Sequence, residues 1–282
     1  MPELPEVESI RKQLEKYLVG HVVKDVEIRY GKKFEGNPKD IVGGKVGGIR
    51  RFGKAQSIDL DNGFSILIHI KLTGQLIYKG PNLKGKGVLS EKVKGGLEGK
   101  HTHIIFHLDK GAKLYYNDVR KFGWIMISKS DELKTKNKFI KNLGPEPLKE
   151  LTEDIFRKTV KSTRRNIKTL LMDQKKIAGV GNIYANDALW LAKIKPNRES
   201  KKLKSDEIKN LFRAIESVLK EGLRRGGASE LSFVTPDGKE GKYQDNTLVY
   251  GKEGEKCKRC KSQLKKMKIS GRGTYYCDHC QL

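Results

Sequence analysis

The chain has 282 residues, and its 59 lysines and arginines against 34 acidic residues give a formal net charge of +25. This length allows two or more domains, and the charge favours a polyanionic partner, nucleic acid ahead of an anionic membrane. Apolar runs such as residues 66–68 end well short of a membrane span, so we expect no membrane insertion. The first helix opens with acids rather than with the basic start of a signal peptide, and an intracellular, cytoplasmic protein is expected.

The pattern of the first 18 residues predicts a helix that begins almost at the N-terminus. Residues 1–7 read Met-Pro-Glu-Leu-Pro-Glu-Val. Pro5 suits a first helical position, where its missing N–H costs nothing. Apolar side chains recur at helical spacing from Val7 to Leu18, so the helix has one face to bury. The chain terminus therefore lies beside the positive end of a helix dipole.

The same residues carry the groups needed for Schiff-base chemistry. Removal of Met1 would make Pro2 a terminal secondary amine, with the carboxyl group of Glu3 beside it. An α-amino group has a pKa of about 7.7–8.0, so a useful fraction is neutral near pH 7. A free amine can attack carbon while a carboxylic acid moves protons. The alternative is an ordinary helix start with proline and glutamate in its first turn.

The region up to about residue 130 is predicted to be mostly β, with the first helix packed on it. Strands are expected over residues 22–30, 57–60, 64–72, 102–108, 113–116 and 124–128. Gly43-Gly44 and Gly47-Gly48 are expected to punctuate the stretch after the first strand, and Asp-Asn-Gly at 61–63 is a strong hairpin signal. Residues 79–100 hold six lysines, six glycines and no aromatic residue, which predicts a long flexible loop. This loop is either an added nucleic-acid contact or a solvated insertion.

The second half of the chain is predicted to be helical. A polar, lysine-rich linker (129–141) and Leu-Gly-Pro-Glu-Pro (143–147) precede it. The turn Gly-Val-Gly at 179–181 exposes backbone amides, and Asn182 is expected to cap the following helix, which makes a natural phosphate site. A further helix is expected over 207–223, and the glycine- and charge-rich residues 232–243 are expected to be mobile.

All four cysteines lie in the tail, in two Cys-x2-Cys pairs separated by sixteen residues. The candidate metal ligands are Cys257, Cys260, Cys277 and Cys280. This spacing is typical of a zinc ribbon, and four thiolates would fold a segment too small and polar to fold alone. Disulfides are the alternative, but they are rare in intracellular proteins. Four protein ligands leave no open position for water, so the zinc is expected to be structural.

Taken together, the motifs resemble the formamidopyrimidine-DNA glycosylase (8-oxoguanine DNA glycosylase/AP lyase) family over nearly the whole chain. They are the N-terminal heptapeptide, Arg-Arg-Phe-Gly-Lys ending at Lys54, His-Ile-Lys-Leu-Thr-Gly (69–74), Asp-Val-Arg-Lys-Phe-Gly (118–123), the segment 173–189 and the cysteine tail. The resemblance implies a multidomain α+β fold. Residues 1–135 would form a catalytic β-sandwich with a leading helix, 136–230 a helix–two-turn–helix domain, and 231–282 a lesion-loop region with a zinc finger.

The resemblance also implies the roles of the catalytic residues. Pro2 would be the Schiff-base nucleophile, Glu3 the general acid/base and Glu6 an orienting group. Lys54 would contact phosphate and donate a proton, although an ordinary surface lysine is its alternative. Arg272 would contact phosphate and donate a proton in δ-elimination.

Five further residues would contact DNA by the same resemblance: Leu72, Arg120, Phe122, Asn182 and His101. The first three would fill the space left by a flipped-out nucleotide. The family has methionine where this chain has Leu72, and a buried strand leucine is the alternative there. The chain also departs from the family at Val119 and at Asp187, whose shorter acid is expected to weaken an internal contact.

The expected function is therefore a bifunctional glycosylase/AP lyase acting on oxidised purines in damaged duplex DNA. We expect a monomeric, nucleoid-associated protein with one structural Zn²⁺ and no organic cofactor. The related endonuclease VIII type, which prefers oxidised pyrimidines, is the nearest alternative; Leu4 favours the purine branch, because the other usually reads Pro-Glu-Gly-Pro-Glu. A DNA-binding scaffold without chemistry and an RNA- or ribosome-associated protein are the remaining alternatives.

Overall fold

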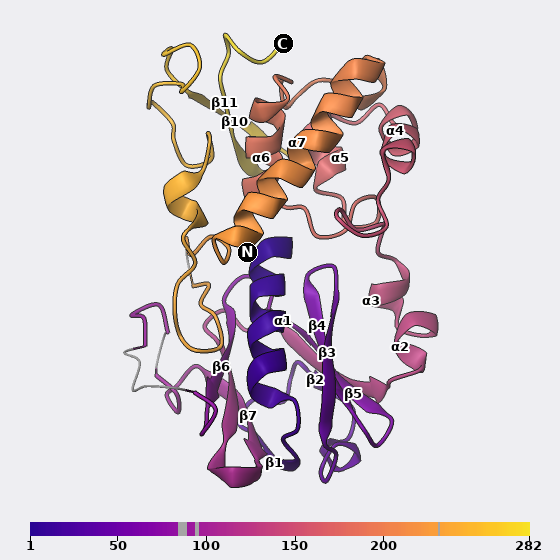
Figure 1. Cartoon of the computed structure of the whole chain (residues 1–282), viewed down its shortest axis with the longest axis vertical. Helices are drawn as coiled ribbons and strands as arrows, with labels where there is room; N and C mark the ends of the chain where they lie inside the picture. The colour runs from indigo at the N-terminus through magenta and orange to yellow at the C-terminus, as the bar shows by residue number, and fades with distance from the viewer. Residues whose placement is uncertain (84–88, 94–95, 231) are drawn as a thin grey trace. The chain divides into compact units, whose positions relative to one another are not determined.

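The computed structural model describes residues 1–83, 89–93, 96–230 and 232–282, and the chain divides into two compact units. One unit comprises Met1–Lys141 and Arg225–Gln244, and the other comprises Asn142–Arg224 and Asp245–Leu282. Helices and strands are mixed as expected for an α+β protein (Figure 1). Within the described ranges, every helix is too short or too polar to cross a membrane. The functional division at residues 135 and 230 stays a prediction.

The first unit consists of helix α1 and two β-sheets. Its elements are α1 (Leu4–Leu18), β1 (Val23–Ile28), β2 (Phe34–Glu35), β3 (Val46–Phe52), β4 (Ala55–Leu60), β5 (Phe64–His69), β6 (Gly74–Lys79), β7 (Thr102–Leu108), β8 (Lys113–Asp118), β9 (Trp124–Lys129), α2 (Glu132–Thr135) and α3 (Lys138–Lys141), with short 3₁₀ turns at Pro38–Asp40 and Asp109–Gly111. One sheet has the strand order β1-β7-β8-β6 and the other β2-β9-β5-β4-β3. All neighbours are antiparallel except β2 and β9.

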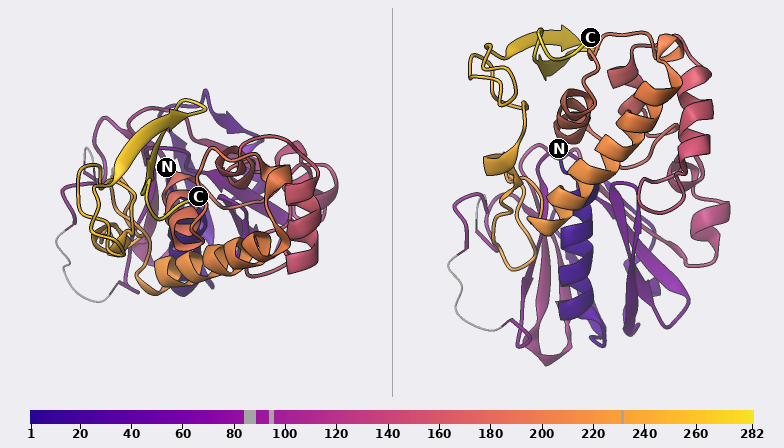
Figure 2. Two further views of the ribbon diagram at one scale, coloured as in Figure 1. Left: turned by 90° about the horizontal axis from the view of Figure 1, so that it is seen from above. Right: turned by 45° about the horizontal axis from the view of Figure 1, so that its top comes forward.

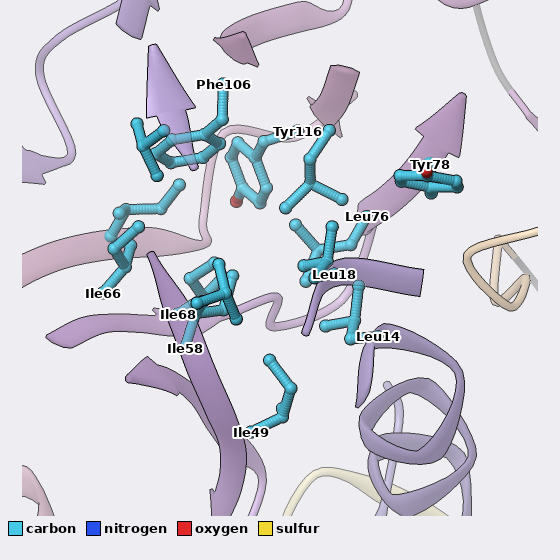
Figure 3. Close-up of a cluster of buried hydrophobic side chains, with 14 of the residues drawn as sticks. Leu14, Leu18, Ile49, Ile58, Ile66, Ile68, Leu76, Tyr78, Phe106 and Tyr116 are labelled. Carbon is cyan, nitrogen blue, oxygen red and sulfur yellow. The ribbon is translucent and has the colours of Figure 1, made fainter. Parts of the chain in front are cut away.

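The core of this unit lies where α1 and the inner faces of both sheets meet (Figure 3). Leu14 of α1 belongs to one apolar cluster with Ile58 and Ile68 from one sheet and Leu76 and Phe106 from the other. Each of these side chains is almost completely buried. Burial of one such side chain stabilises the fold by about 1.5–3 kcal/mol. This shared core holds α1 against both sheets through Ile10, Leu14 and Leu18.

Two details of the predicted strands were wrong. The glycines at 47 and 48 do not separate elements but lie inside β3, where the register against β4 shifts between Val46 and Gly48. Glycine inside a strand often accompanies such an irregularity. The strand expected to reach Leu72 ends at His69, and Lys71 adopts a positive φ of 50° in the turn that follows.

The second unit is helical and ends in a two-stranded hairpin. Its elements are α4 (Glu153–Lys161), α5 (Ile167–Leu171), α6 (Asn182–Leu191), α7 (Ser205–Arg224), β10 (Lys265–Ile269) and β11 (Arg272–Tyr276), with 3₁₀ turns at Ser200–Lys202 and Tyr243–Asn246. Figure 2 shows the long helix α7 running beside α6, and the two helices pack together. The N-cap of α6 is Gly181 without a side-chain hydrogen bond, so the prediction that Asn182 caps this helix was wrong.

Residues 232–243 were expected to be mobile, but most of those side chains are buried. Phe233 joins the core, and Val234 packs with Ile77 and Tyr115 in a smaller apolar cluster. The backbone N–H of Tyr78 in β6 also donates to the carbonyl of Pro236 (2.8 Å). This segment is therefore held on the sheet. The predicted loop at 79–100 falls partly on residues 84–88 and 94–95, which lie outside the described residues.

A buried ion pair joins α1 to the end of β3. Arg51 Nε donates to Glu8 Oε2 at 2.8 Å, with exposed side-chain fractions of 6% and 16%. Burial raises the pKa of Glu8, but hydrogen bonds from Arg51 and Arg11 outweigh this and hold it below its ordinary value. The neighbouring Arg50 pairs with Asp59 but is 39% exposed.

These two arginines give a matched test of what holds α1 in place. Arg51→Met leaves Glu8 without its main partner in a buried site, and we expect a loss of about 3 kcal/mol in the free energy of unfolding. Arg50→Met removes an exposed pair and should cost about 1 kcal/mol or less. Urea unfolding followed by Trp124 fluorescence, in a Trp190→Phe background, measures both. Equal losses in the free energy of unfolding would show that the buried Arg51–Glu8 pair contributes no more stability than the exposed Arg50–Asp59 pair.

Candidate active site and DNA-contact residues

The chain terminus is organised by the carboxylate of Glu6. Its Oε2 accepts a hydrogen bond from the backbone N–H of Glu3 (2.7 Å), and its Oε1 accepts one from the N–H of Ala228 (2.7 Å). Glu3 and Glu6 are only 2% and 1% exposed, and Pro2 is buried beside them. Gly227, with φ of 88°, must be glycine because a Cβ there would lie 2.8 Å from Glu6.

The amino group of the chain lies within this cluster. In the structure it belongs to Met1, and burial lowers its pKa below the ordinary value of an amino terminus. The carboxylates of Glu3 and Glu6 oppose this lowering, and the ammonium group of Lys54 adds to it. A lower pKa leaves more of the amine neutral near pH 7, which is the form that attacks carbon.

Lys54 belongs to the same cluster and is not a solvated surface lysine. It lies in the turn between β3 and β4 and is 4% exposed. The turn is fixed because Arg51 Nη1 donates to the carbonyl of Gly53 (3.0 Å) while Arg51 Nε holds Glu8 of α1. The ion pair between α1 and β3 therefore also positions the lysine relative to the amine.

His69 lies close enough to Lys54 to feel its charge, and no sequence pattern predicted a role for it. Burial, together with the ammonium groups of Lys71 and Lys54, lowers the pKa of His69 to about 3, so its ring is neutral near pH 7. Its Nδ1 accepts a hydrogen bond from the N–H of Lys71 (3.0 Å), and its ring packs on Trp124 and Phe139. A histidine at the end of an apolar strand gives no sequence signal for this environment.

Asp118 brings together two loops that carry predicted insertion residues. Its buried carboxylate accepts hydrogen bonds from Thr73 Oγ1 (2.5 Å), from the N–H of Arg120 (3.2 Å) and from the N–H of Gly123 (2.8 Å). Thr73 Oγ1 also accepts from the N–H of Arg120 (3.0 Å). The turn containing Leu72 and the loop 119–123 are therefore linked through one carboxylate.

The side chains on these loops are accessible. Phe122 is 52% exposed, and the guanidinium carbon of Arg120 lies 4.7 Å from the centroid of its ring. Leu72 is half-buried in a turn, so the alternative of a buried strand leucine was wrong. His101 lies in the turn before β7 and fixes the same loop through its carbonyl, which accepts from the N–H of Asp118 (2.9 Å).

In the second unit, Asn182 and Arg272 are brought close by the hairpin β10–β11. Asn182 Nδ2 donates to the carbonyl of Gly273 (3.2 Å), directly after the exposed Arg272. Lys168, which the sequence analysis missed, is buried and donates to the same carbonyl (3.0 Å) and to Thr274 Oγ1 (2.7 Å). A lysine in an apolar helical stripe was its only signal. A hollow of about 240 Å³ lies beside Arg272 and Lys168.

Asp187 of α6 keeps the internal contact that its shorter side chain was expected to weaken. Its carboxylate accepts hydrogen bonds from three successive backbone N–H groups, those of Leu248 (3.0 Å), Val249 (2.9 Å) and Tyr250 (3.1 Å). The backbone after residue 247 therefore approaches α6 closely enough for an aspartate. This contact fixes the chain that leads into the cysteine tail.

The four tail cysteines form the predicted cluster. Their sulfur atoms all lie within 4.8 Å of one another, with Cys257 and Cys280 at 3.9 Å and Cys260 and Cys277 at 3.5 Å. Tetrahedral zinc with Zn–S bonds of about 2.3 Å places its sulfur ligands about 3.8 Å apart. The type, number and spacing of these residues therefore fit Zn²⁺.

The indole of Trp190 packs against this cluster. Trp190 is 5% exposed and shares an apolar cluster with Cys257 and Cys277. Within the described part of the chain, its Nε1 has no partner that meets full hydrogen-bond geometry, although Cys257 is its nearby acceptor. The guanidinium carbon of Arg259 lies 3.9 Å from the centroid of the ring, and the same group donates to the carbonyls of Trp190 and Leu191.

Comparison with known proteins decides the family. Family models match the formamidopyrimidine-DNA glycosylase N-terminal domain at residues 1–125, its H2TH domain at 143–233 and the zinc finger found in FPG and IleRS at 254–282. The formamidopyrimidine-DNA glycosylase of Listeria monocytogenes serotype 4b is 40% identical over 100% of both chains.

The chain belongs to the formamidopyrimidine-DNA glycosylase family. The glycosylase of Rickettsia massiliae is 37% identical over 100% of this chain and 97% of its own. Structures of the Lactococcus lactis glycosylase with DNA containing Fapy-dG or an abasic site are each 34% identical, with a TM-score of 0.86 and 99% of both chains covered. The predicted family and fold class are therefore confirmed.

Proposed function

We propose that this glycosylase-family chain removes oxidised purines, namely 8-oxoguanine and formamidopyrimidines, from damaged duplex DNA and then cuts the strand as an AP lyase. The observation that carries the proposal is the cluster of three buried charged side chains, Glu3, Glu6 and Lys54, around the amino end of the chain, where burial lowers the pKa of the Met1 amine. A DNA-binding scaffold has no need for this arrangement. The names of the relatives support the glycosylase activity.

The proposed reaction begins after removal of Met1, with the neutral amine of Pro2 attacking C1′ of the damaged nucleotide. The N–C1′ bond forms as the glycosidic bond breaks, and the base leaves with its bonding electrons and takes up a proton. The nitrogen then loses its proton, and its lone pair opens the sugar ring while Glu3 protonates O4′. The resulting iminium acidifies the C2′ proton, so β-elimination releases the 3′ phosphate and δ-elimination releases the 5′ phosphate.

The other predicted residues are assigned to DNA binding and positioning. Leu72, Arg120 and Phe122 would fill the space of the extruded nucleotide, and the exposure of Phe122 supports this role. Asn182 and Arg272 would bind phosphates, as would Lys54 and His101 in the first unit. Phosphate contacts position DNA without reading its sequence, and the net charge of +25 suits them.

Preference for purines rests on the family and on Leu4. One solved complex of the Lactococcus lactis relative, at 35% identity and a TM-score of 0.85, contains an oxidised pyrimidine. Oxidised pyrimidines are therefore the second substrate class to test. Zn²⁺ held by the four cysteines would have a purely structural role, with no organic cofactor involved. The protein would act as a monomer at the nucleoid in the cytoplasm.

Borohydride trapping tests the proposed function. Wild-type protein with Met1 confirmed absent by intact mass is incubated with duplex DNA carrying 8-oxoguanine opposite cytosine, beside a matched duplex with an oxidised pyrimidine. A covalent adduct on the purine duplex that is lost in Pro2→Gly would support both the nucleophile and the substrate class. An adduct on the pyrimidine duplex alone would indicate endonuclease VIII-type specificity. DNA binding without any adduct would indicate a DNA-binding scaffold without catalytic activity.

The lowered pKa of the amine predicts how trapping depends on pH. Trapping should rise with pH as the Pro2 amine loses its proton, and we expect the burial that lowers the pKa of the Met1 amine to lower the pKa of the Pro2 amine as well. A nearby cation disfavours the protonated amine, so Lys54→Met should move the midpoint to higher pH, whereas Lys54→Arg should leave it in place. Single-turnover trapping between pH 5 and 9 measures the midpoint. An unchanged midpoint in Lys54→Met would refute the electrostatic role of Lys54.

The packing of Trp190 predicts its effect on zinc. We expect one Zn²⁺ per chain, with weaker DNA binding after chelation. Trp190→Phe keeps a ring under Arg259 but removes the N–H beside Cys257, and loss of such an outer partner typically weakens metal binding about tenfold or more. Competition with a coloured chelator measures this affinity, and Trp124→Phe in the first unit is the control. Equal zinc affinity in both variants would show that the indole N–H has no role at the metal.

A further inference from the structure

The described part of the lysine- and glycine-rich stretch, Leu89–Val93, makes specific contacts with the segment that follows α7. Lys92 Nζ donates to the carbonyl of Ser229 (2.5 Å) and to Glu240 Oε2 (2.5 Å). Ser90 Oγ donates to the other oxygen of the same carboxylate (2.6 Å). One lysine therefore joins both ends of the segment 229–240.

A buried amide reinforces this attachment. Gln75 of β6 is 2% exposed, and its Nε2 donates both to the carbonyl of Lys92 (2.7 Å) and to that of Ser232 (2.6 Å). Val93 packs with Val234 in the smaller apolar cluster of the first unit. Leu89–Val93 is thus held by a charge pair, a buried amide and apolar side chains. We call the segment Leu89–Val93 the strut.

The strut is connected to the chain terminus through very few atoms. Ser229, whose carbonyl binds Lys92, directly follows Ala228, whose N–H donates to Glu6 Oε1 (2.7 Å). The other oxygen of Glu6 holds the N–H of Glu3 (2.7 Å). A shift of the backbone at Ser229 would therefore displace the adjacent Ala228 and the carboxylate of Glu6, and with it the backbone of Glu3.

We propose that Lys92 is a positioning residue for the N-terminal site: by fixing Ser229 and Glu240, it holds the backbone that fixes Glu6. This inference rests on the proposed function, because it assigns the strut a role in that same reaction. Geometry at a reacting centre is demanding, and a displacement of about 1 Å by a remote change can cost up to about a hundredfold in rate. The role acts on the chemical step and not on the affinity for DNA.

A direct phosphate contact is the competing role for this lysine. The Lys92 side chain is 29% exposed, so solvent reaches it. Its ammonium group, however, already lies 2.5 Å from two acceptors within the protein. A lysine that binds phosphate would lower the affinity for DNA and the slope of log K against log salt when it is removed. A positioning lysine would change neither.

The experiment compares Lys92→Ala with Lys92→Arg, Glu240→Gln and the matched control Lys79→Ala, an exposed lysine at the end of β6. Each is assayed for single-turnover base excision, borohydride trapping and DNA affinity over a salt series. Lys92→Ala and Glu240→Gln should slow excision and trapping roughly five- to fiftyfold. Lys92→Arg should restore most of the rate, and Lys79→Ala should behave as wild type. Affinity and salt slope should stay unchanged throughout.

Hydrogen exchange gives a readout that does not depend on activity. The amide of Ala228 should exchange faster in Lys92→Ala than in wild type or Lys79→Ala, because its hydrogen bond to Glu6 loosens. Wild-type rates in Lys92→Ala, or a reduced salt slope with an unchanged rate, would overturn the proposal. If wild-type protein forms no trapped adduct, the proposed function fails, while faster exchange at Ala228 would still support the strut and unchanged exchange would refute it.

Discussion

The two hydrogen bonds to the carboxylate of Glu6 are the constraint on which the proposed active site depends. One oxygen holds the N–H of Glu3 and the other holds the N–H of Ala228, more than two hundred positions away in the chain. The carboxylate is 1% exposed, and a buried charge persists only where hydrogen bonds satisfy it. Chain termini usually fray in solvent, but here Pro2 and Glu3 are fixed in a buried site.

Other buried polar groups in the first unit extend this arrangement outwards. Arg51 ties α1 to the turn that carries Lys54, and Asp118 ties the turn of Leu72 to the loop of Arg120. Each of these groups accepts or donates more than one hydrogen bond, so its desolvation is compensated locally. The exposed side chains that we propose to contact DNA therefore project from loops whose backbones are held by buried contacts. Because these loops are already ordered, they would lose little conformational entropy when DNA binds.

Much of the candidate site could be predicted from the sequence because its motifs are local. The helix at residues 4–18, the spacing of the cysteines and the segment 118–123 are contiguous patterns. The errors arose where a distant partner decides the structure. Glycines 47 and 48 suggested a break, yet pairing with β4 makes them part of a strand. Residues 232–243 have a polar composition, yet Phe233 and Val234 are buried by the sheet. His69 gave no signal and Lys168 gave only that of a lysine in an apolar stripe, because their packed neighbours define their environments.

The sequence by itself determined the family, the α+β class, the four-cysteine cluster and the helix beside the amine, since each follows from residue type and spacing. Only the tertiary structure decided that burial lowers the pKa of the Met1 amine, that Lys54 adds to this lowering, and that Lys92 reaches Ser229. Burial and long-range hydrogen bonds are properties of residues far apart in the chain. A shifted pKa or a fixed loop therefore arises only when folding brings those residues together and removes water from around them.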